Sequence, residues 1–335
     1  MSMRNLLQTA SITLFLALVI GAARGEDAPL KIQETWSNFF GGREATFHVI
    51  ASPAGGTVDR LGWSLSVAGR TVARGEGSSA GPAGTSITVT IPEVKEGVVM
   101  DAVLSMSAVD RTEQAAANKV LWLFPENPFA GRTEWLKKVG ISLFDPENTT
   151  ADALTKLEVP FTAVRNPAAF ADSTSRLLLI GEGVSLGNYP GLFDEMLRAT
   201  QAGHAVLCLA PSDGSLALPG TQGFQGPRPV SMRFLQNAVI TELDKRLDAE
   251  AWPADGRVTA RELVLKSERQ IVAGEFLAEG EGWPWFEAKF PGGGQLVICG
   301  FAVMEKWAEG PAPRFLLARV IENLFPNREE KETQP

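Results

Sequence analysis

Four carboxylates follow apolar runs of the sequence, at places where a strand would end. They are Asp145, Glu182, Asp213 and Glu305, and Ser212 immediately precedes the third. If these runs form parallel strands of one sheet, the side chains meet at the edge where open α/β sheets bind ligands. Converging carboxylates can bind sugar hydroxyls or a cation, or serve as general acid and base, with Ser212 as a hydroxyl nucleophile. The competing interpretation is that each carboxylate caps a helix or a turn.

Thiol and imidazole chemistry is not expected from this chain. Cys208 and Cys299 lie inside the apolar runs VLCLA and VICGF, so we expect two buried free thiols rather than a disulfide or a nucleophile. The two histidines are His48, in a predicted strand, and His204, at the start of another. We expect both histidines to be structural.

Three tryptophans could offer stacking surfaces. Trp283 and Trp285 flank a predicted turn, and Trp307 follows the last predicted strand. Tryptophans exposed on a protein surface can stack on sugar rings, whereas buried ones fill seams between domains. We therefore name as candidate ligand-binding residues Asp145, Glu182, Asp213, Trp283, Trp285 and Trp307, and as candidate catalytic residues Glu182, Ser212, Asp213 and Glu305.

Residues 176–215 are the unit that would position these side chains. The run Leu177–Ile180 predicts a strand buried on both faces, and residues 192–200 show helical spacing of apolar positions. Gly203 predicts the helix stop, and residues 205–210 predict the next parallel strand. A second strand–helix–strand unit over 139–165, with a helix capped by Thr149 or Thr150, precedes this one. Two such units in series predict an α/β doubly wound, flavodoxin-like, three-layer domain.

The rest of this domain is expected to span residues 139–327, with an insertion at 216–294. Within the insertion, 234–247 can be helical, and 262–266 and 270–277 alternate like strands. The segments 285–290 and 295–301 are joined by PGGG, which predicts a hairpin. A final helix over 311–325 ends at Pro326, and 328–335 predicts a disordered tail.

Residues 28–126 predict an all-β domain. Seven runs alternate apolar and polar residues or are otherwise strand-like, and glycine- and proline-rich stretches separate them. Seven short strands in this length favour a two-sheet sandwich with Trp63 buried within it. Residues 127–138 predict a connector, which Phe129 and Trp135 pack down.

Two resemblances follow from these patterns. Residues 28–126 resemble the immunoglobulin-like modules of secreted bacterial proteins. Residues 139–326 resemble class I glutamine amidotransferase-like domains, including the ThuA-like branch, through RLLLIGEG, the helix after it, HAVLCLAP and the late hairpin with its terminal helix. Catalytic members of that family carry a cysteine on the turn after the strand and a later histidine. Here the cysteine position falls on Ala210 and no histidine follows residue 204, so the resemblance implies a degenerate site.

Composition and the N-terminus limit the partners. The net charge is -8 without a basic run, which argues against nucleic acid and anionic membrane surfaces. GEG at 181–183 lacks the spacing of a nucleotide-binding loop, so we expect no nucleotide. We also expect neither a metal nor a cofactor. Residues 1–25 read as an export signal cleaved after Gly25, which predicts a periplasmic or extracellular protein; an uncleaved segment would be its one membrane attachment.

These observations leave two classes of function. The first is a non-catalytic exported binding module whose ligand is a carbohydrate or a protein. The second is a hydrolase, of glycoside or ester type, that uses carboxylates or Ser212 at the strand ends. Two carboxylates facing each other across an open cleft would favour the hydrolase, and carboxylates closed by internal hydrogen bonds would favour the binding module.

Overall fold

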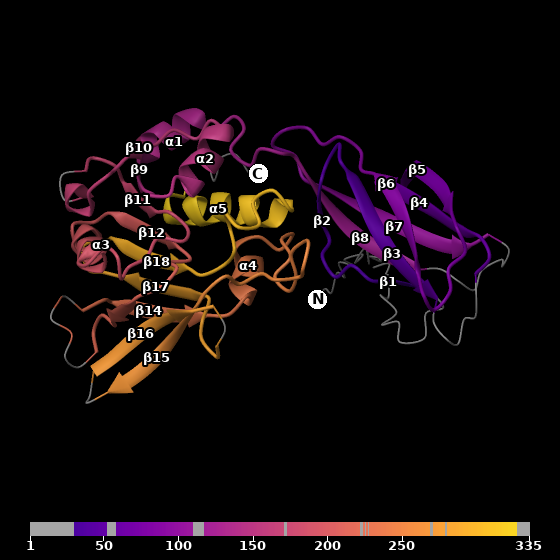
Figure 1. Cartoon of the computed structure of the whole chain (residues 1–335). Helices are drawn as coiled ribbons and strands as arrows, with labels where there is room; N and C mark the ends of the chain where they lie inside the picture. The colour runs from indigo at the N-terminus through magenta and orange to yellow at the C-terminus, as the bar shows by residue number, and fades with distance from the viewer. Residues whose placement is uncertain are drawn as a thin grey trace, which may run out of the picture.

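The computed structural model describes residues 30–51, 58–109, 117–170, 173–221, 224, 226, 228–268, 271–278 and 280–326. The predicted export signal and the predicted tail both lie outside these ranges. The chain is multidomain and mostly β-sheet, with several sheets and few helices. In Figure 1 the first eight strands form one body and the remaining elements form the other, with α5 on the side of the second body that faces the first. No helix in the described ranges is both long enough and apolar enough to span a membrane.

The N-terminal body consists of two sheets that face each other. One sheet has the order β1-β3-β6 and the other β2-β8-β7-β4-β5. The strands are β1 (Leu30–Ile32), β2 (Asn38–Phe40), β3 (Glu44–Ala51), β4 (Leu61–Val67), β5 (Arg70–Gly77), β6 (Thr85–Thr90), β7 (Met100–Ala108) and β8 (Ala117–Phe124). Alternation creates the shared core, because every second residue of β3 is buried, including Phe47 and Val49.

Two details of this body differ from the sequence prediction. The described residues form eight strands rather than seven, because residues 31–38, one of the seven strand-like runs in the sequence, divide between β1 and β2, which belong to different sheets. Trp63 is half-buried rather than fully buried. Its indole lies over Gly75 of the neighbouring strand, where an added Cβ would lie 2.7 Å from the ring.

The second body is built on a seven-stranded mixed sheet of order β10-β9-β11-β12-β18-β17-β14. The first five strands in this order are parallel, and β17 and β14 are antiparallel. The strands are β9 (Ile141–Phe144), β10 (Thr162–Ala163), β11 (Leu177–Ile180), β12 (Ala205–Leu209), β14 (Ser231–Leu235), β17 (Trp285–Lys289) and β18 (Gln295–Cys299). The edge at which the five parallel strands end is called the carboxyl edge below.

Both faces of this sheet are covered. Leu177 and Leu179 of β11 join one apolar core, which includes residues of α1 (Thr133–Val139), α2 (Thr149–Lys156) and α5 (Pro311–Leu324). Leu178 and Ile180 join a second core, which includes residues of η1 (Pro167–Phe170) and α3 (Leu192–Gln201). Successive residues of a strand point to opposite faces, so a continuous apolar run feeds both cores, as the sequence predicted.

The segment 216–294, expected from the sequence to be an insertion, contributes to two sheets. It contributes β14 and β17 to the main sheet, while β13 (Ser215–Ala217), β15 (Glu262–Glu268) and β16 (Ile271–Leu277) form a small antiparallel sheet. The helix predicted over 234–247 is wrong at its start, because Phe234 lies in β14 and pairs with Phe286 of β17. The helix that follows, α4 (Ala238–Leu243), is short. Pairing with β17 has overridden the local helical preference.

The connector is docked, as predicted. Phe129 is buried, and Trp135 packs against the same core as α5. A second junction lies between β2 and the loop after α4. The Asp248 carboxylate accepts hydrogen bonds from the backbone N–H groups of Ser37 and Asn38. The Asn38 side chain donates a hydrogen bond to the Arg246 carbonyl and accepts one from the Asp248 backbone N–H.

Candidate functional site

The carboxyl edge holds all the carboxylates that the sequence singled out. Asp145 follows β9, Glu182 follows β11, Asp213 follows β12 and Glu305 follows β18. Parallel pairing brings these strand ends to one edge of the sheet. Each carboxylate has partners of its own within the protein, however, and these partners differ in kind.

Asp145 caps a helix with one oxygen and leaves the other without a donor. Its Oδ2 accepts the Ala151 N–H at 2.8 Å at the start of α2. Thr149 and Thr150 therefore do not make the predicted cap, and the residue before the helix, Asn148, takes a left-handed conformation. Asp145 Oδ1 is buried and has no hydrogen-bond partner among the described residues. Burial raises the pKa of the Asp145 carboxyl, although the backbone N–H groups of Ala151 and Thr150 oppose that shift.

Glu182 closes the far side of the edge. Its Oε2 accepts the Met304 N–H at 2.7 Å and its Oε1 accepts the Glu305 N–H at 2.9 Å. Burial raises the pKa of Glu182 to about 7, despite those backbone donors. Its own N–H donates to Thr150 Oγ1 at 3.0 Å, which links the turn after β11 to α2.

Asp213 and Ser212 hold a loop together. Asp213 Oδ1 accepts hydrogen bonds from Ser185 Oγ at 2.7 Å and from the Gly187 N–H at 3.2 Å. The Ser212 N–H donates to the Val184 carbonyl, and the Ser212 carbonyl accepts from Arg261. His204 lies at the opposite end of the sheet, with Nδ1 2.8 Å from the Ser175 carbonyl oxygen. The sequence-based candidate Ser212 therefore lies far along the sheet from this imidazole.

Glu305 is part of an ion-pair group at the surface. It pairs with Arg257, and the neighbouring Lys306 pairs with Asp255 at 2.6 Å. The backbone N–H of Glu305 donates one of the two hydrogen bonds that the Glu182 carboxylate accepts. Glu182 and Glu305 are thus brought together through the backbone of Glu305, while its carboxylate is paired with arginine.

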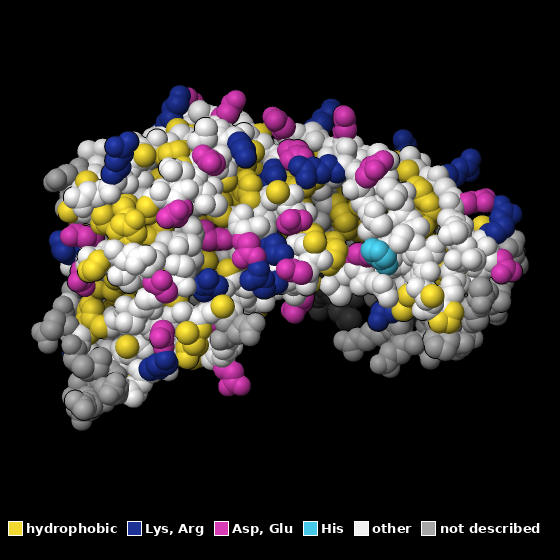
Figure 2. Space-filling model, in the orientation of Figure 1, with side chains coloured by type: hydrophobic (Ala, Val, Ile, Leu, Met, Phe, Trp, Pro, Cys, Tyr) yellow, Lys and Arg dark blue, Asp and Glu magenta, His cyan; other side chains and the backbone are white. Residues whose placement is uncertain are grey.

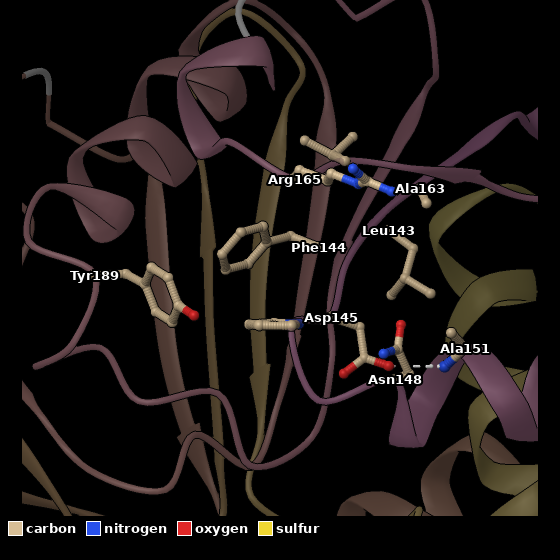
Figure 3. Close-up of a pocket in the computed structure, with 10 residues that line it drawn as sticks. Leu143, Phe144, Asp145, Asn148, Ala151, Ala163, Arg165 and Tyr189 are labelled. Carbon is tan, nitrogen blue, oxygen red and sulfur yellow. Dashed lines mark hydrogen bonds between the residues drawn. The ribbon is translucent and has the colours of Figure 1, made fainter.

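A cavity of about 400 Å³ opens beside Asp145. Its wall includes the ends of β9 and β10, the start of α2, and Tyr189 from the loop before α3. Figure 3 shows one Asp145 oxygen joined to Ala151 and the other turned away from it, with Tyr189 and Arg165 on other sides of the space. Glu182, Asp213 and Glu305 do not line this cavity.

Tyr189 and Arg165 were missed from the sequence. Arg165 follows the two-residue strand β10, which the sequence predicted without naming its end as a site. Tyr189 is the only tyrosine of the chain. That rarity could have drawn attention to it, but its position in a loop gave no indication of what it would contact. Its ring is held perpendicular to Phe144, with ring centroids 5.0 Å apart.

The tryptophan candidates lie in packed surroundings. Trp285 is 1% exposed and Trp307 is 9% exposed, so neither offers a ring face to a ligand, which corrects that prediction. Trp307 packs under the Arg314 guanidinium, 5.6 Å from its ring centroid. Trp283 is half-buried, with its ring 5.3 Å from that of Phe234. Trp285 and Trp307 therefore serve in packing, which was the alternative that the sequence left open.

Both cysteines are free and buried, as predicted. Burial raises the pKa of the Cys299 thiol to about 12 and raises that of Cys208 further. Thiolates are therefore disfavoured at both positions. Within the described ranges, no three His, Cys, Asp or Glu side chains form a group that could hold a metal ion.

Comparison with known proteins does not assign a family. The sequence matches no protein-family model and no curated protein. A search of solved structures finds the CARDB domain of a Pyrococcus furiosus protein in complex with di-metal ions, with 11% identity and a TM-score of 0.20 over 29% of this chain and 89% of that one.

Two longer proteins are also similar in part. A cycloisomaltooligosaccharide glucanotransferase of Paenibacillus sp. has 8% identity and a TM-score of 0.25, over 73% of this chain and 34% of that one. A family 123 glycoside hydrolase from Clostridium perfringens has 9% identity and a TM-score of 0.18, over 51% of this chain and 43% of that one. This chain thus covers less than half of either protein. Scores of this size assign neither a fold nor a function.

Proposed function

We propose that this protein is a non-catalytic binding module that holds a carbohydrate in the cavity beside Asp145. The observation that carries the proposal is the Asp145 Oδ1 atom, a buried carboxylate oxygen without a donor in the described part of the chain, on a residue that lines the cavity. Leaving such an acceptor unpaired costs about 1–3 kcal/mol. Oδ1 is shielded from solvent beside Gly181, so a ligand hydroxyl donates to it only once the Asp145 side chain turns toward the cavity, and that bond would recover part of this cost.

The other walls suit a sugar. Tyr189 supplies an aromatic ring, and the exposed Arg165 supplies several N–H donors for hydroxyl or carboxylate oxygens. Apolar atoms of Leu143 and Phe144 complete the wall. Small-molecule sites combine apolar wall atoms with a few convergent polar groups, and this cavity has both; its volume of about 400 Å³ falls within their usual range of about 300–1,000 Å³.

The internal bonds of the other carboxylates support a non-catalytic role. Glu182 is closed by two backbone N–H groups, Asp213 braces a loop, and Glu305 pairs with Arg257. Hydrolysis would need two of them free on either side of a substrate. One observation favours the alternative hydrolase, the pKa of Glu182 near 7, because a raised pKa is common in general acids. If the native protein hydrolysed a glycoside and Glu182→Gln did not, that result would support the alternative.

The proposal extends to fold class and location. The parallel order β10-β9-β11-β12-β18 supports a doubly wound, flavodoxin-like and amidotransferase-like domain, and the eight N-terminal strands support an immunoglobulin-like sandwich. The order in which strands are added to this sheet reverses between the parallel neighbours β9 and β11. Asp145 directly follows β9, and Gly181 directly follows β11. Ligands of open α/β sheets bind at that crevice. The apolar N-terminal segment supports export.

Binding to an array of neutral, amino and uronic acid glycans tests the proposal. Asp145→Asn keeps an oxygen for Ala151 but places an N–H₂ group where the unpaired oxygen lies. We expect affinity for any bound glycan to fall at least about tenfold, the size of one lost hydrogen bond to a charged group. Asp101→Asn, at an exposed carboxylate of β7, is the matched control and should bind normally. Glycan binding that is equal in both variants, or absent from the native protein, would refute the proposal.

A further inference from the structure

A second cavity adjoins the first one. It measures about 410 Å³ and is lined by residues of the loop before α3, by Phe193 and Asp194 in the first turn of α3, and by residues 214–217 at the start of β13. Tyr189 lines both cavities. The two spaces therefore meet at one aromatic side chain, at neighbouring positions along the carboxyl edge.

The second cavity differs from the first in charge. Among the residues that the structure describes, its charged lining side chain is Asp194, and neither a lysine nor an arginine contributes to its wall. Ser215, which is exposed, adds a hydroxyl, and Phe193, which is partly buried, adds a second aromatic ring beside Tyr189. Figure 2 shows hydrophobic side chains gathered on the part of the visible face where Figure 1 places α3. This wall suits a neutral or amino-bearing sugar ring, whereas Arg165 makes the first cavity tolerant of an acidic one.

The shared loop is held in place before any ligand arrives. Asp213 binds Ser185 Oγ and the Gly187 N–H, and Ser185 Oγ in turn accepts the Asn188 N–H at 3.0 Å. Phe144 fixes the plane of Tyr189 from the other side. Asp213, expected from the sequence to touch ligand, instead holds the loop that separates the two cavities. A preformed wall lowers the entropy cost of binding.

We propose that the two cavities are adjacent subsites for one linear oligosaccharide, with Tyr189 contacting the chain between them. The unit beside Asp145 and Arg165 is neutral or acidic, and the unit beside Phe193 and Asp194 is neutral or amino-bearing. This inference rests on the proposed carbohydrate-binding function and adds the length and the charge order of the ligand. The ligand contacts an aromatic ring in each subsite, so a chain of two or more rings binds more tightly than a single ring.

The single tyrosine allows a direct test. Fluorotyrosine incorporated in place of tyrosine gives one fluorine NMR signal, from residue 189. The probes are glucose, N-acetylglucosamine and glucuronic acid, and linear oligosaccharides that contain them. We expect the signal to shift with each bound probe, and we expect affinity to rise roughly tenfold from the single sugar to the matching oligosaccharide, as one added aromatic contact would give.

Ala217→Trp fills the second cavity from an exposed position of β13 and leaves Asp145 untouched. We expect this variant to bind single sugars as the native protein does and to lose the gain for oligosaccharides. Val120→Trp, at a 54% exposed position of β8, is the matched control and should keep that gain. If single sugars bind through Asp145 but oligosaccharides bind no better, and Ala217→Trp changes nothing, the two-subsite inference is wrong while the proposed function stands. If no probe shifts the Tyr189 signal, both are wrong.

Discussion

The Glu182 carboxylate accepts the Met304 backbone N–H at 2.7 Å, across the end of the sheet. Glu182 follows β11 and Met304 follows β18, so the bond passes over the end of β12, which lies between these strands. The same carboxylate holds the Glu305 N–H. One buried side chain thus ties two separate loops of the carboxyl edge and limits how far the edge can open there.

The free energy of unfolding should depend on the ionisation of Glu182. Its pKa is about 7 in the folded protein, above the ordinary value of 4.5, so the folded state holds the proton more tightly than the unfolded state. This contribution is complete below pH 4.5 and is lost as the pH rises through 7. We expect a loss of up to about 3 kcal/mol across that interval. Denaturant unfolding at a series of pH values measures it.

Glu182→Gln should flatten this part of the pH profile, because glutamine does not titrate. Glu147→Gln, at an exposed carboxylate of the same edge, is the control and should keep the native profile. A Glu182→Gln profile parallel to the native one over this range would show that the carboxylate titrates normally.

Gly181→Ala should weaken glycan binding. A Cβ at residue 181 would lie 2.5 Å from Asp145 Oδ1, closer than a carbon and an oxygen can approach. Asp145 must then move, and its cap on α2 with it. We expect a loss of stability of about 1–3 kcal/mol and loss of Asp145-dependent binding. Gly81→Ala, where an added Cβ meets no atom within 4 Å, serves as the control. Unchanged calorimetric affinity in Gly181→Ala would mean that the position of Asp145 does not matter for binding.

Asn38→Ala should loosen the contact between the two bodies. The Asn38 side chain donates to the Arg246 carbonyl at 2.8 Å and accepts the Asp248 N–H at 2.9 Å, and alanine would leave both backbone groups unpaired. The expected cost is roughly 2–4 kcal/mol. Limited proteolysis should cut faster within residues 125–138, while Asn118→Ala, at an exposed residue of β8, should resist cutting as the native protein does. If Asn38→Ala and Asn118→Ala were cut at equal rates, the contact of Asn38 with Arg246 and Asp248 would not help to dock the two bodies.

Cys208→Ala should leave any glycan binding nearly unchanged. The thiol is fully buried in β12, and its raised pKa disfavours the reactive thiolate. Removing the sulfur should cost roughly 1 kcal/mol, as a small truncation of the core does. Thiol-reagent labelling of the native protein should be slow at both cysteines. Rapid labelling of Cys208, together with loss of function in the alanine variant, would contradict the burial described above.

The pattern of apolar and polar residues predicted those strands whose burial can be seen in their own sequence. The run LLLI in β11 and the alternation in β3 identify strands because the pattern itself states which faces are buried. Phe234 shows the limit of this reasoning. Its segment has helical composition, and pairing with β17, far along the chain, makes it a strand. Pairing between distant segments leaves little trace in either segment alone.

The site was predicted in part for the same reason. Asp145 could be named because it directly follows an apolar run, and the carboxyl edge could be inferred from parallel pairing. Tyr189 and Arg165 come from a loop and from a two-residue strand, where local sequence carries no pattern. Their meeting around one cavity depends on how the loops fold over the sheet.

The pairing of β12 with β18 has a consequence for how the chain folds. These strands are neighbours in the middle of the sheet, yet residues 210–294 separate them along the sequence. The centre of the sheet therefore cannot close until a long intervening segment is brought back, and loop closure of this kind slows folding. Strand β17 enters beside β18 through a short hairpin, so the two arrive together. Until they arrive, the free side of β12 is an unpaired, wholly apolar strand edge, and the emerging chain is most prone to aggregate during that interval.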